Sequence, residues 1–233
     1  MSKSLKNVIN PDDVIAEFGA DTFRLYEMYM GPLEASKPWN PRDIHGLHRF
    51  LQRLWRLVVQ EETGELVVGE QDDHELEKLL HRLIAKVEAD LERLAFNTAI
   101  AAMIEFVNTA TSRREKGDLP ISRSQACRLA LVACPFAPHI AEELWHRLGG
   151  TGLASLEPWP RYEEAYLRDE TVEIAIAIQG KVRHRMHVPT GAASGEIEAL
   201  VLADETVQQA LGGKPARKVI VVPGRMVNIV TGG

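Results

Sequence analysis

Cationic side chains recur at regular spacings in two parts of this 233-residue chain. In the first part, Asn40 to Gln60, apolar residues follow the period of a helix and the basic residues fall on one side of it. These basic residues are Arg42, His45, Arg49, Arg53 and Arg56. A row of this kind can hold a phosphate backbone, which predicts contact with RNA. The alternative is a solvated helix face without a ligand.

The second cationic row lies near the C-terminus, in a stretch that alternates with the period of a strand. Its basic residues are Lys181, Arg183, Arg185 and His187, and they alternate with Val182, His184, Met186 and Val188. More cations follow nearby in the sequence, at Lys214, Arg217, Lys218 and Arg225. A solvent-facing strand can carry such residues without a ligand, but one cationic face in this region favours RNA contact.

The charge is unevenly distributed. The whole chain has a net charge of -6, yet residues 171–233 carry 7 Lys+Arg against 5 Asp+Glu. Overall charge governs solubility and encounter, so an acidic total confines any RNA contact to local basic faces.

The histidines and cysteines do not show the spacing of a metal site. Cys127 and Cys134 are seven residues apart on a predicted helix with apolar neighbours, which is typical of reduced core residues. His139 follows Pro138 in a predicted first helical turn, where we expect its ring to meet a side chain or a backbone group. No metal is expected, and no Ser-His-Asp or Cys-His set can be argued from spacing.

Several segments are predicted to be helices, because capping residues or prolines mark where they begin. Asn10 and Asn40 each precede a proline and should cap a helix. Gly19 should end the first helix, and Asp21 is expected to cap the next one. Later helices are predicted around Leu76 to Leu94, from a cap at Asn97, from a cap at Ser122 to before Pro135, and from Pro138 to Gly149. Short loops and one apolar stripe per helix predict a bundle.

Helical periodicity disappears from about Thr151 to Asp169, where Pro158, Trp159 and Pro160 occur. Beyond it the pattern predicts two strands around a Gln179-Gly180 turn, one or two helices within 194–211, and a second hairpin at Pro223-Gly224. The predicted fold is mainly α with a small α+β domain. We expect connecting helices in 1–38, the bundle in 39–160, a linker in 161–170 and the strand-strand-helix-strand-strand domain in 171–233.

Three motifs resemble known sequences, in the same order along the chain. Met1-Ser2-Lys3-Ser4, with Asn7, resembles the K-M-S-K-S-x-x-N loop of class I aminoacyl-tRNA synthetases without its first lysine. The stretch from Pro135 to Trp145, PFAPHIAEELW, resembles a helix start in the anticodon-binding bundle of the synthetases for leucine, isoleucine, valine and methionine. The third match comprises 172–183, 188–189, 218–224 and 227–230, and is similar to the C-terminal domain of bacterial leucyl-tRNA synthetases. The chain thus resembles the C-terminal portion of that family, beginning inside the signature loop.

This resemblance implies a site and partners. Lys3 would act in catalysis, and Ser2, Lys3 and Ser4 would lie against the phosphates of Mg-bound ATP in the full-length enzyme. The partners would be tRNA(Leu), read through its body rather than its anticodon, and the N-terminal catalytic and editing part, in cis or as a separate subunit.

The N-terminus lacks a secretory signal and no apolar run reaches the roughly 20 residues of a membrane span. We therefore expect a cytoplasmic protein without a membrane partner.

The resemblance also implies that the chain alone binds tRNA but does not catalyse, since no His-x-Gly-His nucleotide fold is present. The function expected is that of the tRNA-binding portion of leucine-tRNA ligase, which attaches leucine to tRNA(Leu) through a leucyl-adenylate. Two alternatives stay open, a stand-alone RNA-binding module and a structural helical bundle with a protein-binding tail.

Overall fold

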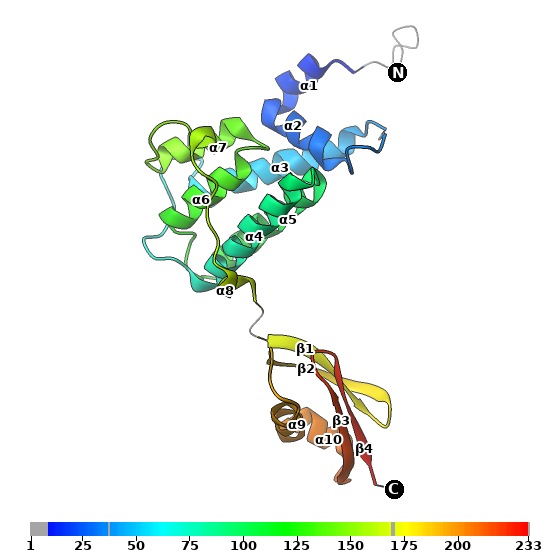
Figure 1. The fold of residues 1–233 in the computed structure, drawn as a ribbon. Coiled ribbons are helices and arrows are strands. Elements are labelled where there is room, and N and C mark those ends of the chain that lie inside the picture. The colour runs from blue at the N-terminus through cyan, green and yellow to red at the C-terminus, as the bar shows by residue number, and fades with distance from the viewer. Residues whose placement is uncertain (1–8, 37, 169–170, 233) are drawn as a thin grey trace. The chain divides into compact units, whose positions relative to one another are not determined.

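The structure, a computed structural model, describes residues 9–36, 38–168 and 171–232 (Figure 1). The chain divides into two compact units, residues 1–167 and 168–233. The first unit is helical, and the second is a four-stranded sheet with two helices. The predicted fold class, mainly α with a small α+β domain, is therefore confirmed. No helix in the described ranges is long and apolar enough to cross a membrane.

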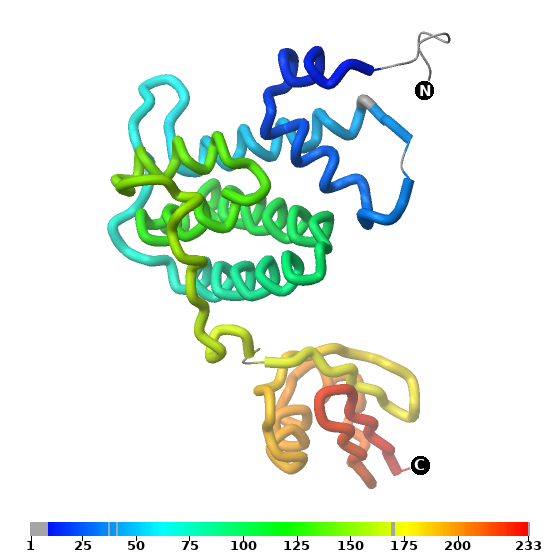
Figure 2. Tube along the Cα trace, turned by 45° about the horizontal axis from the view of Figure 1, so that its top comes forward, coloured from blue at the N-terminus to red at the C-terminus, as the bar shows by residue number. Residues whose placement is uncertain are grey.

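The helical unit is built on a bundle. Its elements are α1 (Pro11–Phe18), α2 (Ala20–Tyr29), α3 (Pro41–Val58), α4 (His74–Glu92), α5 (Phe96–Glu115), α6 (Arg123–Ala133), α7 (Pro138–Arg147), the 3-10 turn η2 (Ala154–Leu156) and α8 (Glu164–Leu167). Helices α4 and α5 lie side by side (Figure 2), α3 packs against α5, α6 packs against α4, and α7 packs against α6 and α3. The apolar stripes predicted from the sequence face one another in a single core, which includes Ile44, Leu54, Leu80, Ile100, Val107 and Leu144.

Three of the predicted helix starts are confirmed by capping hydrogen bonds. The Asn10 side chain accepts from the Asp12 amide at 3.2 Å, and the Asn40 side chain accepts from the Arg42 amide at 3.1 Å. Ser122 forms a reciprocal capping box with Gln125. Each of these caps satisfies backbone donors that the first helical turn leaves free.

Two predicted caps are wrong. Helix α5 begins at Phe96 with Ala95 before it, because the tight turn after α4 brings the Ala95 amide to the Asp90 carbonyl and starts the helix early. Helix α2 begins at Ala20, directly after Gly19, whose φ of 86° suits a residue without a side chain. Asp21 caps a different helix, as described below.

The C-terminal unit has the strand order β2-β1-β4-β3. Its elements are β1 (Thr171–Ile178), β2 (Lys181–Pro189), α9 (Ser194–Ala203), α10 (Glu205–Leu211), β3 (Ala216–Val222) and β4 (Met226–Thr231). The pairs β1–β2 and β3–β4 are antiparallel hairpins turning where predicted, and β1 and β4 pair in parallel at the centre. Both helices pack on one sheet face through a core that includes Ile174, Ile176, Val188, Val201, Val207 and Ile229.

The cationic strand β2 contains a bulge, and the prediction of one cationic face on it is wrong. Ile176 pairs with His184, but the next residue, Ala177, pairs with Val182, so Arg183 is the extra residue. A one-residue shift moves every later side chain to the other face. Val182 therefore shares the open face with Arg185 and is 57% exposed, whereas Lys181 lies opposite Ile178.

Part of the segment expected to be a linker packs against the bundle. Trp159 lies against the main core, and the Glu163 amide donates to Nδ1 of His81 at 2.9 Å. The Tyr166 ring stacks on the His81 ring with centroids 4.5 Å apart, and Nε of Arg82 donates to the Tyr166 carbonyl. We call residues 158–167 the strap, since the helical unit holds them along α4.

Candidate nucleic-acid interface

Helix α3 positions the first cationic row as the sequence predicts. Its apolar side is buried in the core, so helical geometry turns the opposite side outward. Arg42, His45, Arg49 and Arg56 are exposed, and Arg53 is half-buried. The structure thus brings the four predicted arginines to one side of one helix, where they can meet successive phosphates.

Arg53 and Arg56 also line a cavity that the sequence did not reveal. The cavity has a volume of about 510 Å³ and adds Arg114 from the end of α5. Nη1 of Arg114 donates to the Arg56 carbonyl at 3.2 Å, and Nε of Arg56 pairs with Glu61 at 2.9 Å. Nε of Arg53 is buried without a hydrogen-bond partner among the described residues. The cavity can therefore offer guanidinium donors to an anion.

Arg114 lies in the last turn of α5, and its position in this cavity was not predicted from the sequence. No local signal could have linked it to Arg56, which lies 58 positions earlier. Glu61, Glu62 and Glu115 line the same cavity, so an anion bound there must compete with carboxylates.

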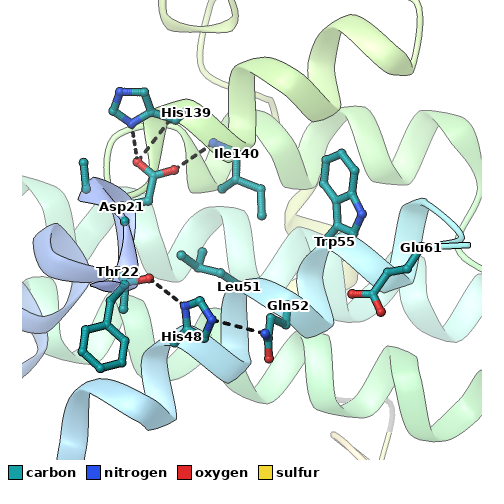
Figure 3. A pocket seen from close by; sticks show the side chains of 12 residues that line it. Asp21, Thr22, His48, Leu51, Gln52, Trp55, Glu61, His139 and Ile140 are labelled. Carbon is teal, nitrogen blue, oxygen red and sulfur yellow. Dashed lines mark hydrogen bonds and ion pairs between the residues drawn. The ribbon is translucent and has the colours of Figure 1, made fainter. Parts of the chain in front are cut away.

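A second pocket, of about 400 Å³, lies where α2 meets α3 and α7 (Figure 3). Asp21 forms its edge, and Figure 3 shows its carboxylate pointing at the start of α7. Oδ1 accepts from the His139 amide at 3.2 Å and from the His139 ring at 2.8 Å, and Oδ2 accepts from the Ile140 amide at 2.8 Å. Asp21 thus caps α7, whose own N-cap residue, Ala137, has no side chain that could do so. The expectation that the His139 ring meets a protein group is confirmed.

Arg24 holds the other side of the same turn. Its Nη2 donates to the Pro135 carbonyl at 2.9 Å and its Nε to the Phe136 carbonyl at 3.3 Å. Asp21 and Arg24 lie one turn apart on α2. This short helix therefore hydrogen-bonds the start of the 135–145 motif through both backbone amides and backbone carbonyls. The contacts fix the connecting helices onto the bundle.

Inside the pocket, three polar side chains form a chain across α2 and α3. Nε2 of Gln52 donates to Nε2 of His48 at 3.2 Å, and Nδ1 of His48 then donates to Oγ1 of Thr22 at 3.4 Å. This direction follows from the Gln52 amide, which leaves Nε2 of His48 as the acceptor.

The predicted cations of the C-terminal unit are all exposed but do not form one cluster. Arg183 and Arg185 lie on β2 at one edge of the sheet, whereas Arg217 and Lys218 lie on β3 at the other. Lys181 begins β2, and Lys214 precedes β3. Arg185 pairs with Glu173 at 2.7 Å. Arg225 lies nearer the middle of the sheet. Its carbonyl accepts a hydrogen bond from the amide of Ala175 on β1, and Ala175 is the cross-strand partner of Arg185 on β2.

Ionised groups buried in the helical unit stabilise the bundle rather than form a reactive site. Burial by itself would raise the pKa of Glu77, but hydrogen bonds from Arg128 and Gln125 outweigh it and lower this pKa to about 2. Both Glu77 oxygens accept from Arg128 at 2.7 Å.

Burial also raises the pKa of the Cys127 and Cys134 thiols, which are free. In the described ranges, no three His, Cys, Asp or Glu residues are grouped to hold a metal.

The remaining predicted site residues, Ser2, Lys3 and Ser4, lie outside the residues that the structure describes.

The bundle includes the PFAPHIAEELW motif at the start of α7, and this part of the chain matches a known class of domain. The family model described as "Anticodon-binding domain of tRNA ligase" matches residues 73–199, more than half of the chain. The chain therefore belongs to this family.

The particular relatives are leucine–tRNA ligases. The chain is 50% identical over 231 residues to those of Saccharopolyspora erythraea and Nocardia farcinica, and 47% identical over 233 residues to that of Mycobacterium marinum. Each match covers 99% of this chain and 24% of the relative, so the chain spans about a quarter of their length, and it corresponds to their C-terminal part. The suspected resemblance is confirmed.

A solved structure agrees with this assignment. It is the ternary complex of Agrobacterium radiobacter K84 agnB2 LeuRS with tRNA and LeuAMS, and it matches with a TM-score of 0.75 and 31% sequence identity. The match covers 100% of this chain and 32% of that one.

Proposed function

We propose that this chain is the tRNA-binding C-terminal portion of a leucine–tRNA ligase, which attaches leucine to tRNA(Leu) with ATP through a leucyl-adenylate. The observation that carries the proposal is the 50% identity to leucine–tRNA ligases over 99% of the chain. Membership of the tRNA-ligase family also disfavours a stand-alone RNA-binding module or a structural bundle. We also propose that the protein acts in the cytoplasm.

The proposed catalytic contribution is limited to Lys3, with Ser2 and Ser4 beside it. An ammonium placed where charge develops on the phosphates of Mg-bound ATP lowers the barrier to adenylate formation. The nucleotide fold itself would come from an N-terminal catalytic and editing part, in cis or as a separate subunit. The isolated chain would then bind tRNA without catalysis.

The proposed tRNA contacts are two sets of phosphate-binding cations. The first is the α3 row, Arg42, Arg49, Arg53 and Arg56, with Arg114 beside its C-terminal end. The second lies on the C-terminal unit and comprises Lys181, Arg183, Arg185, Lys214, Arg217, Lys218 and Arg225. All of these side chains except the half-buried Arg53 are exposed, which supports contact with a polyanion, and the protein would read the tRNA body.

The test is the salt dependence of tRNA(Leu) affinity. Each lost phosphate contact lowers the slope of log K against log salt by roughly 0.7 to 0.9. We expect Arg42→Gln with Arg49→Gln to flatten the slope by about two contacts. Lys181, Arg183 and Arg185 changed together should flatten it by fewer than three contacts, because the bulge separates Lys181 from the others.

The control is Arg161→Gln, which removes an exposed cation outside both sets. It should leave the slope unchanged. Failure of the whole chain to bind tRNA(Leu) at low salt would refute the proposed function.

A further inference from the structure

We propose that the pocket between α2, α3 and α7 receives one unpaired nucleobase of the bound tRNA. The inference rests on the proposed function, because a tRNA lying along α3 must deliver the base. It goes beyond the proposed phosphate contacts, because it assigns a base-binding site to this pocket.

The walls of the pocket suit a flat aromatic ring. Phe18, His48 and Trp55 line it together with the aliphatic side chains of Leu51 and Ile140. Aromatic surfaces bind bases by stacking, whatever the base, because every base has a π face. The Trp55 ring is already oriented, since the Arg147 guanidinium lies 5.0 Å from its centroid.

The charged side chains at the edge of the pocket already have partners within the protein. Asp21 accepts from the two amides and the ring at the start of α7, and Glu61 pairs with Arg56 at 2.9 Å. Both carboxylates are therefore held by protein groups, which weakens their repulsion of a nucleotide.

Gln52 is the polar group that can read the base. Its amide donates one N–H to His48, and the His48 ring is held in turn by Thr22 on α2 (Figure 3). This chain fixes the amide plane and leaves the carbonyl oxygen and the second N–H for a ligand. A glutamine amide matches the adjacent acceptor and donor of adenine, so we infer that adenine is the preferred base.

The arginine row supplies the route into the pocket. On a helix, residues three and four positions apart are surface neighbours, so Gln52 lies between Arg49 and Arg56. Both arginines are exposed. A nucleotide whose base lies against Gln52 thus has cations on either side for its flanking phosphates.

Two variants test the pocket without touching the arginines. Ala20→Leu adds bulk at a pocket-lining position in the first turn of α2, and Gln52→Ala removes the reading amide. Ala16→Leu is the matched control, because Ala16 is exposed on α1 and does not line the pocket. All are measured as the whole chain for tRNA(Leu) affinity at several salt concentrations, with chemical footprinting of the unpaired bases.

We expect Ala20→Leu and Gln52→Ala to weaken binding about tenfold, or about 1.4 kcal/mol, with the salt slope unchanged. In the wild-type complex one unpaired base should be protected, and it should regain reactivity in both variants but not in Ala16→Leu. Wild-type affinity and footprint in both pocket variants would refute the base site and leave the proposed function standing. Absence of tRNA binding by the wild-type chain would refute the proposed function instead.

Discussion

Asp21 and Glu77 show how single carboxylates organise the helical unit. Asp21, on α2, closes the N-terminal turn of α7, which lies 118 residues away. Glu77, on α4, joins Arg128 and Gln125 of α6 to His81, which in turn accepts from the strap. Asp21 satisfies donors of α7, and Glu77 satisfies donors of α4 and α6, so the loss of either should be felt beyond its own helix.

Replacing Asp21 by alanine should lower the free energy of unfolding by about 1 to 3 kcal/mol, because two backbone amides and a ring lose their acceptor. Amide hydrogen exchange at His139 and Ile140 should accelerate in the same variant. Glu17→Ala, at an exposed position on α1, serves as the control and should change stability by less than about 0.5 kcal/mol. Unchanged exchange at both amides would mean that Asp21 does not cap α7.

Glu77 should make stability depend on acid. Its pKa of about 2 lies below the ordinary value of 4.5, so its contribution is present above pH 4.5 and is lost as the pH falls towards 2. The shift predicts a loss of about 2 kcal/mol between pH 7 and pH 3. Urea unfolding at both pH values should show that Glu77→Gln, though less stable at pH 7, loses less on acidification.

The control for this change is Glu75→Gln in the same helical turn, where the side chain is 57% exposed. This variant should keep the acid sensitivity of the wild type. Equal acid losses in the wild type and Glu77→Gln would contradict the role given to Glu77.

At the scale of elements, the strap and the bulge both change what the sequence pattern predicts. The strap extends the helical unit to residue 167 through Trp159, Glu163 and Tyr166. The bulge at Arg183 divides the cations of β2 between two faces of the sheet. The strap is placed by its contacts with α4, and the β2 side chains are placed by the pairing of β2 with β1.

Limited proteolysis should cut the chain between Leu167 and Thr171, because the strap is held by the bundle and β1 by the sheet. Releasing the strap with His81→Ala should open additional cleavage within 158–167, for example at Arg161. The exposed His146→Ala is the control and should keep the wild-type pattern. First cleavage of the wild type inside the strap would show that its contacts are weak.

The alternation places Val182 and Val188 on the same strand face, and the bulge changes the role of Val182 alone. Val188 is fully buried under the helices, so Val188→Ala should destabilise the C-terminal unit by roughly 1 to 3 kcal/mol. Val182 is 57% exposed, and Val182→Ala should cost less than about 0.5 kcal/mol. Amide exchange in β1 and β4 measures both, and a larger effect from Val182 would argue against the observed register.

At the scale of the whole molecule, the proposed RNA contacts lie on both units, and the relatives are about four times as long as this chain. We expect the chain alone to show no leucine-dependent ATP/pyrophosphate exchange. If an N-terminal part from a relative restores exchange, Lys3→Ala should lower its rate more than it weakens leucine binding, because the contact acts in the transition state. Robust exchange by the pure chain would contradict the proposed division of labour.

The sequence alone determined features that depend on neighbouring residues. The caps at Asn10, Asn40 and Ser122, the turns at Gln179-Gly180 and Pro223-Gly224, and the change from helical to strand periodicity were all predicted, because each is set within a few residues. The arginine side of α3 followed in the same way from helical spacing. The family followed from ordered motifs.

Only the tertiary structure decided features that depend on distant partners. Asp21 is a better cap for α7 than for its own helix, Arg114 meets Arg56 from the end of α5, and the strap is held by His81. The register of β2 against β1 places the bulge at Arg183, which alternation along one strand cannot reveal. Within a regular helix or strand, sequence spacing specifies which side a residue occupies, but pairing and packing between elements decide where that regularity is interrupted and what each side contacts.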